Sequence, residues 1–398
     1  MKKILFLLVI VLTLISCKTN PPTEPNQAEY GTINLRSNID GAEIFVDNIS
    51  TGKFTPDSLI TVTVGSHILE LKKVGFFTFV DTIDVQLNQE TKVIATLSVI
   101  MDFGIINVLS NESDAEIYLD GINTGKVTPD TIRTTIGEHI VELHKNGYNI
   151  TTDTVTVVKD IQTDIQLNLI PFKTVLIEDF ANVSCNPCVV SNKILEQLTN
   201  HTFGRKRLVA VKFPTNFPSP VDPFFLANGP DCTSRMNYYN IQIAPTNVID
   251  GLFKPIPSDS NDVKSKILTQ LEKVPQFVIL VDHSINGNNY TINITLEIKD
   301  LSNLDFSNLV LHTVVTETNI EFATPPGSNG ETKFFDVMRK MLPGNQGESL
   351  TSYNQTGTYT FQRQLTLNSN WNASNINTVV YVQNTNTKEI FQTGSTFN

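Results

Sequence analysis

The feature that most constrains this chain of 398 residues is an internal repeat in its N-terminal part. The clearest pair of matching stretches is residues 42–47 (AEIFVD) and residues 115–120 (AEIYLD), and further motifs follow both in the same order. Repetition at a fixed spacing indicates one structural unit that is used twice. We therefore expect two similar modules, over residues 30–100 and 101–170.

Both modules alternate apolar and polar residues with the period of a β-strand, and clusters of Asp, Asn, Gly and Pro separate the alternating runs. These patterns predict two small antiparallel β modules. The second copy carries Leu119-Asp120-Gly121, Thr128-Pro129 and Gly147-Tyr148, and in these motifs it resembles the PEGA domain. The resemblance implies a surface spacer or a binding module, and it names no ligand.

One histidine recurs in the repeat, as His67 and His139. Neither has a cysteine or a carboxylate at the spacing of a metal site, so we expect no metal and assign both to a turn or a strand end.

The motif Cys185-Asn186-Pro187-Cys188 lies between the apolar run 175–180 and a segment with helical periodicity. Free N–H groups and the dipole at the start of a helix favour a thiolate. This placement points to thiol–disulfide chemistry. A structural disulfide and half of a metal site have the same spacing, and both stay open as alternatives.

An α/β domain is expected over residues 171–274, because a strand, the cysteine motif, a helix, a second strand and a proline-headed strand follow one another. This order resembles the thioredoxin fold, as do Asp179-Phe180 before the cysteines and Ala244-Pro245-Thr246 after them. The resemblance implies that Cys185 is the attacking thiol and Cys188 the resolving thiol. It also implies that Asp179 accepts the proton of Cys188 and that Pro245 is a substrate-facing cis-proline.

Three features depart from that pattern. Residues 182–184 (NVS) replace the aromatic lead of thioredoxins, and residues 214–230 form an inserted, proline-rich loop that we expect to cover the site. Cys232 follows this loop, in an expected short helix over 231–240, and three roles are open for it: a partner of Cys185 or Cys188, a third redox thiol, or an idle buried residue.

A last helix is expected to begin with Ser260 as its cap.

Residues 275–398 return to alternating β patterns and predict a C-terminal β-sandwich, closed by a hairpin about residues 384–387. Residues 336–343 (DVMRKMLP) and 381–384 (YVQN) resemble a family of Bacteroidetes outer-membrane lipoproteins named after a twenty-eight-kilodalton outer membrane protein. The resemblance extends over residues 172–398 and implies a place in the outer membrane.

The N-terminus reads as a lipoprotein signal peptide, residues 1–17, in which Leu14-Ile15-Ser16-Cys17 resembles the bacterial lipobox. Acyl chains on Cys17 would tether the protein to a lipid bilayer without spanning it. Residues 18–29 carry several prolines and no periodicity, and they predict a flexible linker. Together these features predict an outer membrane lipoprotein, periplasmic or surface-exposed.

Charge excludes one class of partner. With 29 basic and 40 acidic residues the net charge is −11, and no basic stripe is present to neutralise phosphates, so nucleic acid is not an expected partner.

The sequence therefore predicts a mostly β, multidomain envelope lipoprotein that needs no cofactor. One hypothesis gives it thiol–disulfide oxidoreductase activity on protein thiols or disulfides. The alternative is a non-enzymatic surface lipoprotein whose β modules bind polysaccharide or protein and whose cysteine pair is structural.

Overall fold

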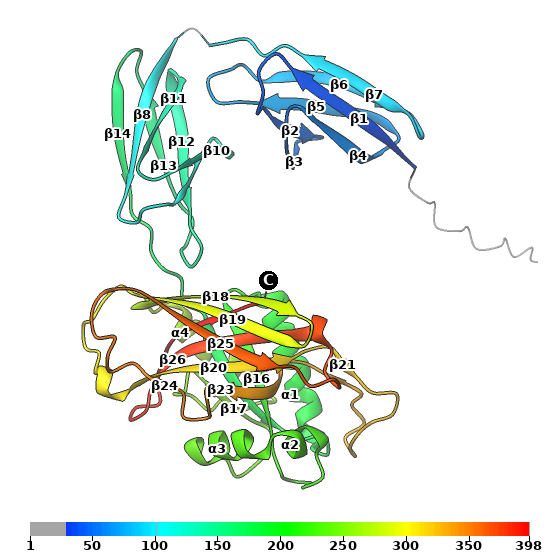
Figure 1. The fold of residues 1–398 in the computed structure, drawn as a ribbon, viewed down its shortest axis with the longest axis vertical. Coiled ribbons are helices and arrows are strands. Elements are labelled where there is room, and N and C mark those ends of the chain that lie inside the picture. The colour runs from blue at the N-terminus through cyan, green and yellow to red at the C-terminus, as the bar shows by residue number, and fades with distance from the viewer. Residues whose placement is uncertain (1–28, 101, 398) are drawn as a thin grey trace, which may run out of the picture.

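The computed structural model describes residues 29–100 and 102–397 of the chain. The expected signal peptide with Cys17, and residues 18–28 of the expected linker, lie outside the described residues. Two small β modules are followed by a larger C-terminal body, and the second module lies between the first module and this body (Figure 1). The described chain is mostly β, as predicted, and it forms several sheets.

Seven strands build each module. The first module contains β1 (Tyr30–Ser37), β2 (Glu43–Val46), β3 (Ile49–Phe54), β4 (Asp57–Thr63), β5 (Gly65–Lys72), β6 (Phe79–Val85) and β7 (Glu90–Ala95). The second module contains β8 (Phe103–Ser110), β9 (Glu116–Leu119), β10 (Ile122–Val127), β11 (Asp130–Thr135), β12 (Gly137–His144), β13 (Thr151–Val157) and β14 (Gln162–Leu167).

The two modules have the same topology, which confirms that the repeat is one unit used twice. The sheets β4-β1-β7 and β3-β2-β5-β6 of the first module correspond to β11-β8-β14 and β10-β9-β12-β13 of the second. Most strand pairs are antiparallel, but β7 runs parallel to β1 and β14 runs parallel to β8. Between the two strands of each parallel pair, the chain passes through the four-stranded sheet of the same module. Alternate residues such as Ile33 and Leu35 point inward and form the core between the two sheets.

A glycine, Gly31 or Gly104, lies near the start of the first strand of each module, and both this glycine and the recurring histidine have structural reasons. A Cβ atom on Gly31 or Gly104 would overlap a backbone oxygen of the opposing turn, so only glycine fits. His67 Nδ1 lies 2.7 Å from Asp47 Oδ2, and its Nε2 lies 2.8 Å from the carbonyl oxygen of Thr63. His139 repeats this arrangement in the second module. Each histidine thus links a turn to a strand end, and the hydrogen bond with Asp47 raises the pKa of His67.

The C-terminal body begins with mixed α and β structure. It contains β15 (Val175–Ala181), α1 (Asn186–Gln197), the π-helix η1 (Leu198–Thr202), β16 (Leu208–Pro214), α2 (Pro223–Ala227), α3 (Gly229–Tyr239), β17 (Thr246–Ile249) and α4 (Ser260–Leu271). The rest is almost wholly β. It contains β18 (Phe277–Asn286), β19 (Asn289–Ile298), β20 (Leu309–Glu317), β21 (Ile320–Glu321), β22 (Lys333–Phe334), β23 (Val337–Leu342), β24 (Glu348–Ser349), β25 (Gly357–Thr366), β26 (Ile376–Asn384) and β27 (Ile390–Ser395). Two 3₁₀ turns precede strands, η2 (Phe306–Asn308) and η3 (Ala373–Asn375).

One sheet of eight strands runs through this body, in the order β17-β15-β16-β23-β20-β26-β27, with β24 paired to β20. β15 and β16 are parallel, and β17 is antiparallel to β15. The sheet crosses from residues 171–274 to residues 275–398 where Lys212 of β16 pairs with Val337 of β23. The strands of the two expected C-terminal domains therefore share one sheet.

Two layers cover this sheet. Helices α1 and α4 pack on one face of β15, β16 and β17, and α3 packs on the other face. Farther along, the sheet β18-β19-β25 packs on β20, β26 and β27 and builds the sandwich half of the body. The expected closing hairpin is confirmed as β26 and β27.

The local helix predictions are largely confirmed. The segment after the cysteine motif is α1, and Cys232 lies on α3. The cap of α4 is a correction: Asp259, rather than Ser260, has extended backbone angles and accepts hydrogen bonds from the N–H groups of Asn261 and Asp262. A carboxylate at this position also suits the positive end of the helix dipole.

Candidate functional site

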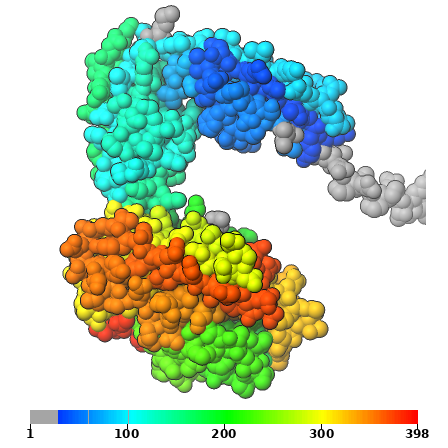
Figure 2. All heavy atoms as spheres, in the orientation of Figure 1, coloured from blue at the N-terminus to red at the C-terminus, as the bar shows by residue number. Residues whose placement is uncertain are grey.

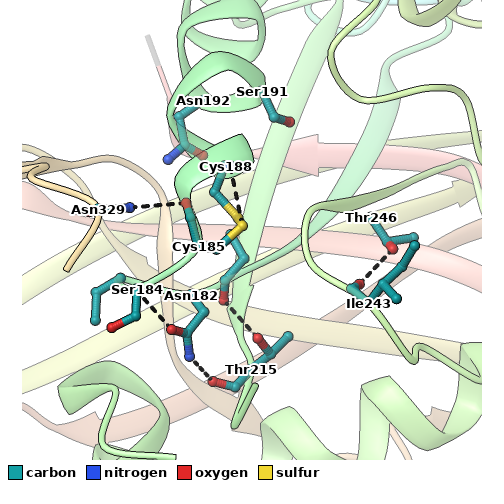
Figure 3. Close-up of a disulfide and its surroundings, with 12 residues drawn as sticks. Asn182, Ser184, Cys185, Cys188, Ser191, Asn192, Thr215, Ile243, Thr246 and Asn329 are labelled. Carbon is teal, nitrogen blue, oxygen red and sulfur yellow. Dashed lines mark hydrogen bonds between the residues drawn. A yellow bond between two sulfur atoms is a disulfide. The ribbon is translucent and has the colours of Figure 1, made fainter. Parts of the chain in front are cut away.

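The two cysteines of the motif are joined in a disulfide at the start of α1 (Figure 3). Cys185 is the N-cap of the helix, and its sulfur accepts a hydrogen bond from the backbone N–H of Cys188 at 3.2 Å. Pro187 stands in the first turn, where its missing N–H has no partner to lose. The sequence thus places both sulfurs at the helix end that stabilises a thiolate.

Both cysteines are buried. Cys185 is 2% exposed and Cys188 is 0% exposed, and they form a small apolar cluster with Ala181 and Ala244. The Ala244–Pro245 peptide bond is cis. Pro245 therefore follows directly on a residue that packs against the disulfide.

Asp179 lies on β15, beneath the helix, and is buried. Its Oδ2 pairs with Nζ of Lys212 on β16, and the same ammonium group donates to Oδ1 of Asn192 on α1. Its second oxygen, Oδ1, has no hydrogen-bond partner among the described residues. Asp179 is thus linked to the cysteine-bearing helix through Lys212 and Asn192, and it does not hydrogen-bond a cysteine directly.

A loop from much later in the chain bonds to the turn that carries Cys185. We call residues 327–331, between β21 and β22, the cover segment. The backbone N–H of Asn329 donates to the carbonyl of Val183 at 3.2 Å, and its side chain donates to the carbonyl of Cys185 at 3.4 Å (Figure 3). Glu331 accepts two hydrogen bonds from Asn192, at 2.9 and 3.0 Å. The cover segment therefore fixes both the turn before the helix and the helix itself.

The inserted loop supports the other side of the same turn. Asn182 donates from its side chain to the carbonyls of Thr215, at 2.6 Å, and Ser219, at 2.9 Å. Asp222 accepts from the backbone N–H of Val183 at 2.8 Å and also caps α2, and burial raises the pKa of this carboxyl. Residues 182 and 183, directly before the cysteine motif, are thus held by the loop 214–222.

A cavity of about 400 Å³ lies beside α1, and Asp179, Asn192, Lys212 and Glu331 are among its lining residues. Residues 329–336 also line the cavity, and the first three of them belong to the cover segment. Solvent can therefore approach the Asp179–Lys212 pair along this cavity although both sulfurs are buried.

Cys232 stands apart from this site. It is free and fully buried, within an apolar cluster that includes Phe180 and Phe213, and burial raises the pKa of its thiol. Because Cys185 and Cys188 pair with each other, the alternative in which Cys232 is bonded to one of them is wrong for this state.

The motifs of the C-terminal part join it to the α/β part. Gln383 of the YVQN motif accepts hydrogen bonds from Arg235 of α3 at 3.1 Å, and Arg235 also pairs with the buried Glu178 of β15 at 2.6 Å. Asp336, the first residue of DVMRKMLP, pairs with Arg205 at 2.5 Å. These buried ion pairs link segments far apart in the chain.

Sequence reasoning missed four residues of the site. Lys212 left a signal, since it is the charged residue in the apolar run 208–213. Asn192, Asn329 and Glu331 left none, because polar residues in a helix and a loop are ordinary and their meeting depends on the tertiary fold.

Comparisons with known families agree with this architecture. The PEGA domain family matches residues 30–99 and 103–172, and the family described as outer membrane protein Omp28 matches residues 233–395. Two PEGA domains and an Omp28 domain are thus found in the chain, as the motifs predicted. The Omp28 match begins within α3, so it takes in the second part of the α/β region.

No curated protein matches the chain. Among solved structures, HBP35 of Porphyromonas gingivalis is similar with 14% identity and a TM-score of 0.48, over 57% of this chain and 75% of that one. A protein from Agrobacterium tumefaciens is similar with 12% identity and a TM-score of 0.36, over 56% of this chain and 92% of that one. The minor pilin GBS52 of Streptococcus agalactiae is similar with 10% identity and a TM-score of 0.16, over 35% of this chain and 97% of that one.

The PEGA and Omp28 families indicate a surface protein of the cell envelope. Within residues 29–100 and 102–397, no helix combines the length and the apolar character needed to cross a bilayer.

Proposed function

We propose that this envelope protein exchanges disulfides with protein thiols through Cys185 and Cys188, on a thioredoxin-like α/β unit. The observation that carries the proposal is the disulfide at the N-terminus of α1, with the Asp179–Lys212 pair on the strands beneath the helix and Ala244, the residue before Pro245, packed against the cysteines. The parallel pair β15 and β16, joined by α1, and the antiparallel β17 after Pro245 support the thioredoxin-like arrangement.

The exchange runs through a mixed disulfide. A substrate thiolate attacks the sulfur of Cys185, the bond between Cys185 and Cys188 breaks, and Cys188 leaves as a thiolate that takes up a proton. A second substrate thiolate then attacks the mixed disulfide and releases Cys185. The substrate is oxidised to a disulfide, and the protein gains two electrons as a dithiol. In the reverse direction Cys185 attacks first and Cys188 resolves.

Asp179 is the proposed proton acceptor for Cys188 when the dithiol is reoxidised. Its free oxygen Oδ1 has room for a proton, and Lys212 holds the other oxygen. The cavity beside α1 gives that proton a route to solvent.

We further propose that Cys17 is acylated and anchors the protein in the outer membrane. The support is the lipobox-like sequence Leu14-Ile15-Ser16-Cys17 together with the envelope families. Labelled palmitate should be incorporated into the wild-type chain in a bacterial envelope and absent from Cys17→Ser.

A second candidate is a non-enzymatic surface protein in which the disulfide only fixes the turn before α1. Burial of both sulfurs favours it, as do the hydrogen bonds that tie the cover segment to the carbonyls of Val183 and Cys185. The two candidates differ in one respect. Disulfide exchange requires the cover segment to move away so that a substrate thiolate can reach Cys185, and a purely structural disulfide does not.

A pair of measurements separates them. The full chain with Cys17→Ser is equilibrated in dithiothreitol buffers, alkylated and analysed by mass spectrometry, and its reduction of insulin is followed with Cys185→Ser as the inactive control. Asn329→Ala with Glu331→Ala should speed both reactions, because it removes the side-chain bonds to Cys185 and Asn192. Glu321→Ala is the matched control, since among residues 29–100 and 102–397 the ion-pair partner of this exposed glutamate of the same hairpin is Lys333 alone. Inactivity of both the wild type and the double variant would overturn the exchange proposal.

A further inference from the structure

A groove of about 410 Å³ lies between the two PEGA modules, far along the chain from the disulfide. One wall comes from β2, β3 and the end of β5 of the first module, and the other from β10 and β11 of the second module. These modules are the blue and the cyan to green bodies of Figure 2. Nothing in the disulfide chemistry uses this groove.

Cations are concentrated in the groove although the chain carries a net charge of −11. Its lining includes Lys72, Lys73, Lys126 and Arg133, against one carboxylate, Glu43.

Two of these cations are already neutralised. Lys72 pairs with Glu70 at 2.9 Å, and Lys126 pairs with Asp130 at 2.9 Å. Lys73 donates instead to the carbonyl of Asp40 at 2.8 Å, and Arg133 stacks on the ring of Phe103. Within the described part of the chain, Lys73 and Arg133 therefore have no carboxylate partner, and one of them lies on each wall.

Glu43 contributes a carboxylate, which accepts hydrogen bonds, to the lining of the groove. It is 8% exposed, and its Oε1 accepts a hydrogen bond from Ser50 at 2.5 Å. Its Oε2 is buried and has no partner among the described residues. A buried carboxylate oxygen without a donor is unfavourable, so this atom calls for a donor such as a hydroxyl group.

The groove also presents an aromatic face. Phe54, at the end of β3, is 44% exposed and lines the groove with the polar residues Asn123 and Thr124. An exposed ring beside hydrogen-bonding side chains suits the apolar face of a sugar. Inorganic phosphate would leave this ring unused, and a fatty acid would bring no hydroxyl to Glu43.

We propose that this groove binds an acidic polysaccharide. A uronate carboxylate accepts from Arg133 and Lys73, a sugar hydroxyl donates to Oε2 of Glu43, and a sugar ring stacks on Phe54. Charge-assisted bonds from a guanidinium group are among the stronger polar contacts, so Arg133 carries most of the affinity. The site needs both modules, because Lys73 and Arg133 come from different ones.

Isothermal titration of the full chain, as Cys17→Ser, with a hexamer of galacturonic acid tests this site, with maltohexaose as the neutral probe. Arg133→Gln and Lys73→Gln should each weaken binding of the acidic hexamer, by about tenfold for Arg133→Gln. Phe54→Ala should weaken it as well. Lys159→Gln is the matched control, since Lys159 is an exposed cation of the second module that lies outside the groove and pairs with Asp102.

Three results would overturn the proposal. The first is the absence of binding to the acidic hexamer, and the second is equal binding of maltohexaose. The third is a loss on Lys159→Gln as large as that on Arg133→Gln, with no effect of Phe54→Ala, which would show general charge attraction only. Thermal unfolding of each variant shows whether the modules stay folded. None of these outcomes depends on the redox state of Cys185 and Cys188.

Discussion

The two junctions of this protein, between the modules and between the second module and the C-terminal body, use the same part of a module in different ways. In each module the turn after β5 or β12, in the four-stranded sheet, faces the next body. This turn contains Gly75-Phe76 in the first module and Gly147-Tyr148 in the second. The two modules share one fold, but their contacts at this turn differ.

The second junction is closely packed. The hydroxyl of Tyr148 donates to Glu297 of β19 at 3.0 Å, and burial raises the pKa of this phenol. Lys299 lies 2.6 Å from Glu112 of the module and 3.7 Å from Glu297. Val278 of β18 packs into the core of the second module, so the two bodies share apolar as well as polar contacts.

The first junction is sparser. Val74 packs against the core of the second module, and the space around it is the groove of about 410 Å³. Phe76 has no hydroxyl with which to repeat the contact of Tyr148, and it packs against the core of its own module. The difference teaches that a repeated module can be packed closely against one neighbour and leave a groove against another through the choice of a few side chains.

Gly147→Ala should have the largest effect on this comparison. The residue has a φ of +86°, and an added Cβ would lie 2.5 Å from Cγ1 of Val278. Backbone strain and overpacking together should lower the free energy of unfolding by about 3 kcal/mol. Urea unfolding of the full chain measures the loss, and proteolysis between β14 and β15 reports undocking.

Gly75→Ala is the matched control for that change. Its φ is +84°, but the nearest atom to an added Cβ is the carbonyl oxygen of Arg133, at 3.9 Å. Only the strain remains, so the loss should be about 1 kcal/mol. Equal losses for the two glycines would contradict the difference in packing between the junctions.

Tyr148→Phe makes the second turn like the first and should have a smaller effect. It removes the hydrogen bond to Glu297, which should cost about 1 kcal/mol of stability at this junction. Phe76→Tyr is the reciprocal variant and should change stability little, because Phe76 packs within its own module. Hydrogen exchange of β19 should rise in Tyr148→Phe alone; unchanged exchange there would show that the hydroxyl contributes nothing to docking.

A pH-dependent term in the first module should be the smallest effect. The hydrogen bond with Asp47 raises the pKa of His67 above its usual 6.5, so the folded module favours the imidazolium. This stabilisation is fully present below the unfolded pKa of about 6.5 and is lost as pH rises through the folded pKa. Urea unfolding of the first module on both sides of that range should show the slope.

His67→Gln is the test variant for that term. It lacks the titrating group, so its stability should not follow this slope. A slope that survives in His67→Gln would assign the pH dependence to another group.

Much of the fold could be predicted because it is local. The period of the strands and the helix that begins within the cysteine motif leave their mark within a few residues, and the repeat shows directly as two matching stretches of sequence. The cap of α4 was misplaced by one residue, since both Asp259 and Ser260 are good capping types and only the backbone angles distinguish them. The partner of Asp179 was missed although Lys212 stands out in its strand.

The sequence by itself thus determined two copies of one β module, a cysteine pair at the start of a helix and a β-rich C-terminal part. Only the tertiary structure decided that one sheet joins residues 171–274 to 275–398, that the cover segment bonds to the turn at Cys185, and that Tyr148 docks on Glu297. The physical reason is distance along the chain. Asn329 and Cys185 are 144 residues apart, and Tyr148 and Glu297 are 149 residues apart, so each pair meets only in the folded protein and no local pattern records the contact.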